Sequence, residues 1–158
     1  MKKDFFDIMY KLMQENKNVT LLFCGLGYPR YDEFKKKFKD RAINTEASEQ
    51  TALDIAVGLA YEGKIPFVYT ITPFLLRGFE TIRTYINREN LHVVLIGAGR
   101  DEEYSKHDGY SHDERDIKEI LGTQKNIVQY YPDNIDHLQH DIIEAIGNKK
   151  PNFINIHK

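Results

Sequence analysis

The sequence has a single cysteine, Cys24, which excludes an internal disulfide framework. It also lacks a long hydrophobic run: the amino-terminal segment MKKDFFDIMYKLMQ is too charged for a signal peptide or a membrane span. Neither sign of charge dominates, because the formal net charge is -2 and the pI is near 6.3. Nothing in this balance favours nucleic acid. We therefore expect a cytoplasmic protein that binds neither membranes nor nucleic acid.

Repeats and low-complexity tracts are absent as well. One glycine motif resembles part of a dinucleotide-binding fingerprint but is incomplete. Gly25-Leu26-Gly27 follows an apolar run, but a dinucleotide-binding fingerprint needs a third glycine and a helix that begins at once. Here Tyr28-Pro29-Arg30 follow instead. We interpret the motif as the turn at the end of a strand.

What the sequence does contain is a regular alternation of apolar runs and amphipathic segments. With 158 residues, of which 41% are hydrophobic, it suits one compact domain spanning 1–158, with a lead-in helix within 1–16. The alternation predicts a doubly wound α/β fold of three layers, with about six mainly parallel strands and helices on both faces. The expected strands are 19–24, 41–45, 65–71, 91–96, 127–131 and 153–156, and the helices between them are 31–38, 47–62, 74–87, 113–122 and 134–146.

Helical spacing also predicts which side chains face the core. They are Phe5, Ile8, Met9 and Leu12 in the first helix, Phe34 and Phe38 in the second, Phe79, Ile82 and Ile86 in the fourth, and Ile135, Leu138, Ile142 and Ile146 in the last.

Glu49 is the most conspicuous polar residue, because it opens a helix whose circumference is largely apolar or small. Leu53, Val57 and Gly58 extend the apolar surface beyond one stripe, so this helix should be enclosed on several sides. The helix start, with Asn44 or Thr45 as the expected cap, favours an anion, whereas apolar neighbours raise the cost of its charge. The alternative is that Glu49 only complements the helix dipole.

Other candidates for function also follow strand ends. Phe74 comes after the strand 65–71, and a long polar loop with His107, Asp108 and His112 comes after the strand 91–96. Since ligands of parallel sheets bind outside the carboxyl ends of the strands, one crevice could hold these residues together with Glu49. The two histidines match no common zinc pattern, so we predict no metal site made by this chain alone.

Three segments, in this order, resemble a known family. They are RAIN with SEQ (41–44 and 48–50), GLAYEGKIPFVYTITPFLLRGFETIR (58–83) and HDGYSHDERDI (107–117). Together they resemble the pyrimidine-binding domain of the transketolase family of thiamine-diphosphate-dependent enzymes, over about Arg41 to Pro132. The resemblance implies the thiamine-diphosphate-binding fold, here as a stand-alone subunit.

The resemblance implies roles for the candidate residues. Glu49 matches the catalytic glutamate that hydrogen-bonds a ring nitrogen of the cofactor's aminopyrimidine and so activates its thiazolium carbon. Phe74 matches the aromatic residue that stacks on this ring, and Thr72 lies beside it as a third cofactor-binding candidate.

The same resemblance implies a substrate site. Asp108 and His112 would contact hydroxyls of a sugar donor, with His107 beside them and His112 also serving proton transfer. Arg77 stands where deoxyxylulose-phosphate synthases carry an arginine and would recognise a phosphate, or else form a surface ion pair with Glu80. Departures at Glu46, Pro73, Tyr110 and Asp113 bear on the substrate more than on the cofactor.

The family's Gly-Asp-Gly motif, which holds the diphosphate through Mg²⁺, has no counterpart in this sequence. We therefore expect a second subunit that carries the diphosphate-binding domain, in a heterotetramer, with self-association through the helix 47–62. The hypothesis is a split transketolase-like enzyme that moves a two-carbon ketol unit between sugars and is inactive as a single chain. The alternatives are a subunit of a split 2-keto acid decarboxylase, of an acyloin or deoxyxylulose-phosphate-type synthase, or a non-catalytic binding module.

Overall fold

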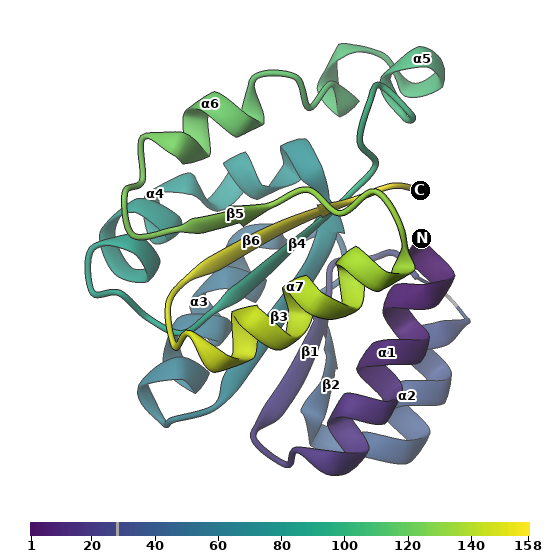
Figure 1. Cartoon of the computed structure of the whole chain (residues 1–158), viewed down its shortest axis with the longest axis vertical. Helices are drawn as coiled ribbons and strands as arrows, with labels where there is room; N and C mark the ends of the chain where they lie inside the picture. Colours follow the sequence, from purple (N-terminus) through teal and green to yellow (C-terminus); the bar gives the residue numbers. More distant parts are fainter. Residues whose placement is uncertain (28) are drawn as a thin grey trace.

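Six parallel strands form one sheet in the order β2-β1-β3-β4-β6-β5, which confirms the predicted α/β class (Figure 1). The computed structural model describes residues 1–27 and 29–158, so Tyr28, which interrupts the glycine motif, lies outside the described residues. The strands are β1 (Val19–Phe23), β2 (Ala42–Asn44), β3 (Ile65–Ile71), β4 (Val94–Ala98), β5 (Val128–Tyr130) and β6 (Asn152–Ile156).

Helices cover both faces of this sheet. The α-helices are α1 (Lys2–Glu15), α2 (Arg30–Phe38), α3 (Glu49–Tyr61), α4 (Phe79–Thr81), α5 (Ser105–Asp108), α6 (Ile117–Gly122) and α7 (Ile135–Gly147). Shorter helical turns are η1 (Lys39–Arg41), η2 (Thr72–Gly78), η3 (Ile82–Asn87) and η4 (Tyr110–His112). In Figure 1, α1 and α7 lie in front of the sheet and α3 lies behind it.

Alternate strand residues enter two separate cores because successive side chains of a strand point to opposite faces. In β1, Leu21 and Phe23 join the core under α1, α2 and α7, whereas Leu22 joins the core under α3 and α6. In β4, Ile96 and Leu95 divide in the same way. Both faces of the sheet are therefore buried, which explains why its strands are apolar throughout.

The strand order reverses at two places, between β1 and β3 and between β4 and β6. Every neighbouring pair in the sheet is parallel, so the carboxyl ends of all six strands lie at one edge. Crevices that bind ligands form at such reversal points, outside the carboxyl ends. The fold thus directs the search for a site to the ends of β1, β3, β4 and β6.

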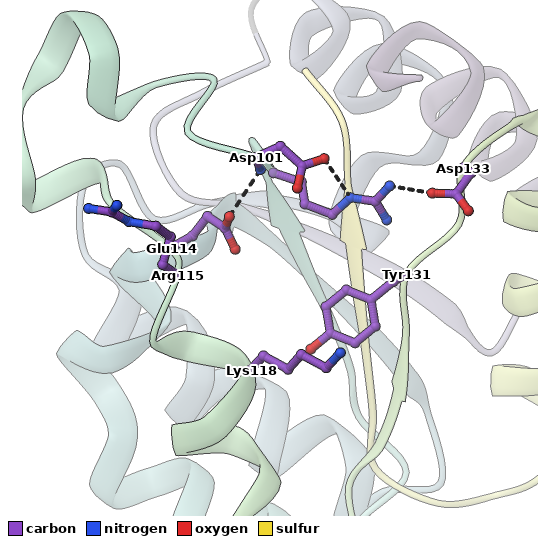
Figure 2. Close-up of a pocket in the computed structure, with 7 residues that line it drawn as sticks. Asp101, Glu114, Arg115, Lys118, Tyr131 and Asp133 are labelled. Carbon is purple, nitrogen blue, oxygen red and sulfur yellow. Dashed lines mark hydrogen bonds and ion pairs between the residues drawn. The ribbon is translucent and has the colours of Figure 1, made fainter.

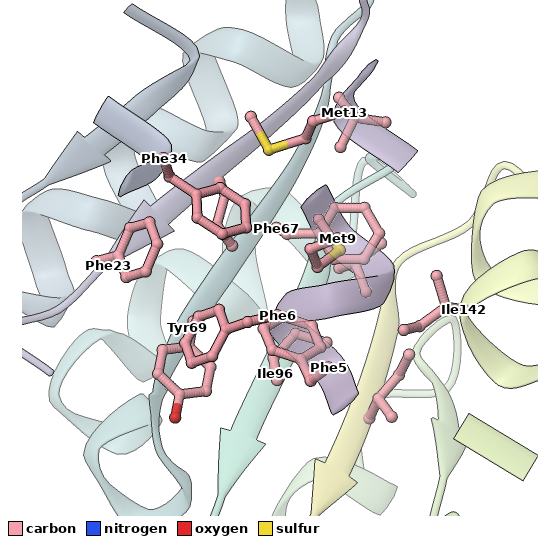
Figure 3. Packing of buried hydrophobic residues seen from close by; sticks show 14 of the residues in the cluster. Phe5, Phe6, Met9, Met13, Phe23, Phe34, Phe67, Tyr69, Ile96 and Ile142 are labelled. Atoms are coloured by element: carbon pink, nitrogen blue, oxygen red, sulfur yellow. The ribbon is translucent and has the colours of Figure 1, made fainter. Parts of the chain in front are cut away.

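An aromatic cluster attaches α1 to the sheet (Figure 3). The ring of Phe6 lies 4.9 Å from Tyr69, 5.8 Å from Phe23 and 6.1 Å from Phe34, measured between ring centroids. The prediction for the inward face of this helix was only partly right: Phe5 and Met9 are buried, but Phe6 and Met13 are the other buried residues. Ile8 and Leu12 only border the core.

Three further expectations need correction. β4 begins at Val94 rather than at 91 and continues through Gly97 and Ala98, where Thr72 and Phe153 pack against Gly97. The helix expected over 113–122 forms only as α6, Ile117–Gly122. Ile135 in the first turn of α7 is 48% exposed, since the helix turns this end away from the core.

Within residues 1–27 and 29–158, no helix combines the length and the apolar character needed to cross a bilayer.

Candidate functional site

Glu49 is buried at the start of α3, where it is 2% exposed. Its Oε1 accepts a hydrogen bond of 3.2 Å from the Thr70 hydroxyl, and its Oε2 accepts one of 2.8 Å from Nη1 of Arg77. Thr70 belongs to β3, which pairs with β1, so the carboxylate lies at the first reversal point of the sheet. Thr70 itself was not identified from the sequence, because a threonine in a buried strand carries no signal of its own.

The capping prediction for α3 was wrong. The residue before the helix is Ser48, whose hydroxyl lies 2.7 Å from that of Thr51 and makes no cap hydrogen bond to the backbone. Thr45 instead extends the sheet, since its N–H donates to the carbonyl of Phe23 at 2.9 Å. Glu46, between them, has a φ of 53°, in the left-handed region that favours glycine. This conformation explains why a glycine is usual at that position.

The 3₁₀-helix after β3 places the side chain of Arg77 over the ring of Phe74. The sequence predicts an α-helix over 74–87, but Thr72–Gly78 is a 3₁₀-helix, followed by a short α-helix and a π-helix over Ile82–Asn87. Side chains three residues apart eclipse one another in a 3₁₀-helix. Accordingly, the Arg77 guanidinium carbon lies 3.9 Å from the centroid of the Phe74 ring.

Gly78 allows this turn to approach α3 closely. A Cβ atom at Gly78 would lie 2.4 Å from Cδ1 of Leu53 and 3.3 Å from the Gln50 Cα, so no larger residue fits without a shift. Beyond it, Thr81 donates to Asp54 at 2.7 Å and accepts from Gln50 at 2.7 Å, which ties the two segments together. The close packing explains how Arg77 reaches Glu49.

The structure excludes the alternative partner of Arg77. Glu80 pairs with Arg83 at 2.9 Å on the surface, whereas Arg77 pairs with Glu49. The Arg77 side chain is 49% exposed and that of Glu49 is 1% exposed, so the ion pair extends from the protein surface to a buried carboxylate.

His112 completes a ring cluster at this site. Its imidazole lies 4.9 Å from the Phe74 ring with the two planes at 63°, and its Nδ1 lies 3.0 Å from the Ser111 hydroxyl. The structure therefore brings Glu49, Phe74, Arg77 and His112 together, as the sequence suggests they should be.

His107 and Asp108 lie on α5 and are exposed, and η4 carries His112 from there toward η2. Tyr110 is 84% exposed. These residues line the outer loop rather than the buried part of the site.

The hydroxyl of Thr72 takes part in a chain of buried hydrogen bonds. Its hydroxyl lies 2.9 Å from Oδ1 of Asn155 and 3.2 Å from the carbonyl of Ala98. The Asn155 amide donates to Glu114 at 3.3 Å. Gly97 makes room for this arrangement, because a Cβ there would lie 2.6 Å from Oγ1 of Thr72. The hydroxyl is thus engaged with the sheet, and a contact with a cofactor stays a prediction.

The same chain leads to a polar pocket of about 570 Å³ at the second reversal point (Figure 2). It lies at the ends of β4 and β5, and Glu114, which accepts from the Asp101 N–H at 3.0 Å, forms part of its wall. Its lining combines acidic and basic groups with one tyrosine: Arg100, Asp101, Glu114, Arg115, Lys118, Tyr131 and Asp133. Sequence reasoning missed this group, although Asn155, a polar residue within the final apolar strand, was a possible signal.

Two of the departures noted above have local explanations. Pro73 occupies the first turn of η2, where its fixed φ suits a helix start and its missing N–H is not needed. Asp113 is buried and accepts hydrogen bonds from the backbone and side chain of Arg115.

Among the residues described, no group of three histidine, cysteine or acidic side chains has the geometry to hold a metal ion.

Cys24 has a buried thiol near Glu49, and its titration tests whether this part of the protein is buried. Burial raises the pKa of its thiol from 9.0 to about 12, and the Glu49 charge acts in the same direction. The unfolded thiol ionises near pH 9 and the folded one near pH 12, so stability is complete below pH 9 and falls above it. We expect urea unfolding to lose up to about 1.4 kcal/mol per pH unit between pH 9 and 10 through this group. Cys24→Ala should lack that part of the decline; an identical decline would contradict the assignment.

Comparisons with known proteins show the family of this chain. The family model described as the transketolase pyrimidine-binding domain matches residues 1–158. The 1-deoxy-D-xylulose-5-phosphate synthase of Dehalococcoides mccartyi (strain CBDB1) is 30% identical over 157 residues, which cover 93% of this chain and 23% of that protein. A putative transketolase C-terminal section of Methanocaldococcus jannaschii is 26% identical over 158 residues, covering 99% of this chain and 50% of that protein. The chain thus spans a quarter to a half of these relatives.

Solved structures share the fold. A split-gene transketolase, described as an inactive beta4 tetramer, superposes with a TM-score of 0.85 at 25% identity, covering 98% of this chain and 49% of that one. The transketolase of Campylobacter jejuni superposes with a TM-score of 0.84 at 14% identity, over 99% of this chain and 25% of that one, a likeness of fold alone. With the family model matching the whole sequence, the chain belongs to the transketolase pyrimidine-binding domain family, whose enzymes depend on thiamine diphosphate and Mg²⁺.

Proposed function

We propose that this chain is the pyrimidine-binding subunit of a split transketolase-like enzyme, which transfers a two-carbon ketol unit between sugars. The observation that carries the proposal is that one side chain, Arg77, contacts both the buried carboxylate of Glu49 and the partly buried ring of Phe74, at the β1–β3 reversal point. A flat heterocycle needs a ring to stack on and a group that exchanges a hydrogen bond with its nitrogen, and these two residues supply both.

The residues fit the aminopyrimidine half of thiamine diphosphate. Glu49 would bind the ring nitrogen, Phe74 would stack on the ring, and Thr72 would hold the backbone of η2 in place through Asn155. The cofactor, once bound, would supply a nucleophilic carbon that attacks the carbonyl of the donor. Mg²⁺ and the diphosphate would be held by a second chain.

The groups on the outer side of the site suit a polar substrate. His112 lies against Phe74 and could exchange a proton with a donor hydroxyl, while Asp108 and His107 could bind further hydroxyls. Arg77 is half exposed at the same place and could bind an anionic group of the substrate. We assign these four residues to substrate binding.

The outer face of α3 supports association between subunits. Ala52, Leu53 and Ala56 are buried, but Gly58 has nothing within 4 Å of its Cβ position and Tyr61 is 59% exposed. The enclosure expected for this helix is therefore incomplete within one chain. We propose that a second copy covers this face and that two further chains carrying the diphosphate-binding domain complete a heterotetramer. The neighbour described as an inactive beta4 tetramer is consistent with such self-association.

Reconstitution tests this proposal. We expect the chain to co-purify with a polypeptide that carries a Gly-Asp-Gly motif, and the pair to bind thiamine diphosphate only with Mg²⁺ present. The pair should transfer a ketol unit from ketose donors, and each chain alone should be inactive. Conversion of 2-keto acids in place of ketoses would favour the decarboxylase or synthase alternative. Failure of the co-purified pair to bind the cofactor would favour a non-catalytic module and overturn the proposal.

A further inference from the structure

Arg77 makes the two contacts that the proposed function assigns to the aminopyrimidine ring. Its guanidinium carbon lies 3.9 Å from the centroid of Phe74, and its Nη1 lies 2.8 Å from Oε2 of Glu49. One flat group thus lies over the stacking ring and at the same time donates to the buried carboxylate.

The chemistry of the two groups explains why they compete. A guanidinium and an aminopyrimidine are both planar and delocalised, and both contain an amino group on a carbon that bears a second nitrogen. Either can stack on an aromatic face and donate an N–H to a carboxylate. Because Oε1 of Glu49 accepts from Thr70, Oε2 is the oxygen that would share a proton with a ring nitrogen. The neutral ring nitrogen brings no proton, so Glu49 takes one up from solvent when the guanidinium leaves.

We propose that Arg77 is a placeholder for the pyrimidine ring, which must leave Glu49 and Phe74 before the ring can enter. This inference rests on the proposed function. Arg77 is the mobile member of the pair, since its long side chain is 49% exposed, whereas Glu49 is held inside the protein. While Arg77 is paired with Glu49, its positive charge compensates the buried negative charge of the carboxylate, which would be costly without a partner.

Displacement also gives Arg77 a second role. Once the guanidinium leaves Glu49 and Phe74, it has lost its ion-pair partner, and its half-exposed side chain turns toward the outer side of the site, where His112 lies. An anionic group of the substrate then meets an unpaired guanidinium only after the ring has bound. The order of binding, ring first and anionic substrate second, follows from this exchange.

The affinity of the purified chain for 4-amino-2,5-dimethylpyrimidine, the ring fragment of the cofactor, tests the inference through NMR titration. Arg77→Met removes the guanidinium that lies over Phe74 and keeps a flexible side chain of moderate length. We expect it to lower Kd at least tenfold, which corresponds to a binding free energy more favourable by about 1.4 kcal/mol. Arg77→Gln provides a second, polar variant. Arg83→Met is the matched control, because Arg83 pairs with the exposed Glu80, and it should leave Kd unchanged.

A rescue experiment separates competition from a structural effect. In Arg77→Ala, millimolar guanidinium chloride should refill the space beside Glu49 and weaken binding of the fragment again, whereas it should have little effect in Arg83→Ala. Unchanged or weaker binding in both Arg77→Met and Arg77→Gln, including no binding at all, would overturn the inference. Glu49→Gln tests the proposed function separately. If the fragment binds equally well when this substitution is made in the wild type and in the Arg77 variants, the assigned role of Glu49 is refuted. The effect of the Arg77 variants on Kd then still decides whether Arg77 competes with the ring.

Discussion

Glu49→Gln is expected to lower turnover of the assembled enzyme by about 10²–10⁴-fold, the usual contribution of a positioned acid or base. Glutamine keeps the size of the side chain and can still accept from Thr70, but it cannot carry the negative charge or exchange a proton with the ring nitrogen. The measurement is the rate of the proposed ketol transfer at saturating donor, with the proposed partner chain in excess.

The fold should survive this change. Arg77 is half exposed, so loss of the ion pair should lower the free energy of unfolding by no more than about 2 kcal/mol. Glu80→Gln is the matched control, because Glu80 is an exposed glutamate in the same region that pairs with Arg83, and it should retain full turnover. Wild-type turnover in Glu49→Gln would refute the catalytic assignment, whereas failure to assemble would show a structural role instead.

The order of elements and the class of the sheet could be predicted because buried parallel strands are continuous apolar runs. Leu22 and Phe23 face opposite cores and both must be apolar, so the strand is evident from composition alone. The burial of Glu49 could be inferred for a similar reason, since a small, apolar helix follows it. Local patterns were sufficient wherever one segment determined its own environment.

Arrangements that depend on packing between distant segments could not be predicted. The 3₁₀-helix η2 packs closely on α3 at Gly78, where a Cβ atom would meet Leu53, and Arg77 pairs with Glu49 across these two segments rather than with its near neighbour Glu80. The link from Thr72 to Asn155 joins residues 83 positions apart. Hydrophobic spacing describes single helices and strands, and contains no information about such contacts.

The choice of inward residues in α1 was only partly right for a related reason. Helical spacing allows several stripes, and Phe6 lies one position away from Phe5, so either could have been assigned to the edge. The sheet decides between them, because Tyr69 and Phe23 present rings against which the ring of Phe6 packs.

Phe6→Ala is accordingly expected to lower the free energy of unfolding by about 3–5 kcal/mol, as for other fully buried phenylalanines. The truncation would leave a cavity among Tyr69, Phe23 and Phe34, and it would remove the ring that lies against Gly27 at the end of β1. Since small domains have total stabilities of about 5–15 kcal/mol, much of the stability would be lost. Urea unfolding followed by circular dichroism measures the change.

Phe74→Ala is the matched control for this prediction, because it removes the same side chain from a partly buried position at the site. It should lower stability by about 1 kcal/mol or less but abolish binding of the pyrimidine fragment, whereas Phe6→Leu should recover most of the stability lost in Phe6→Ala. This opposite pattern would establish that α1 is integral to the fold and that Phe74 serves the ligand. A loss below about 1 kcal/mol in Phe6→Ala would instead mean that α1 docks weakly and that the sheet is stable without it.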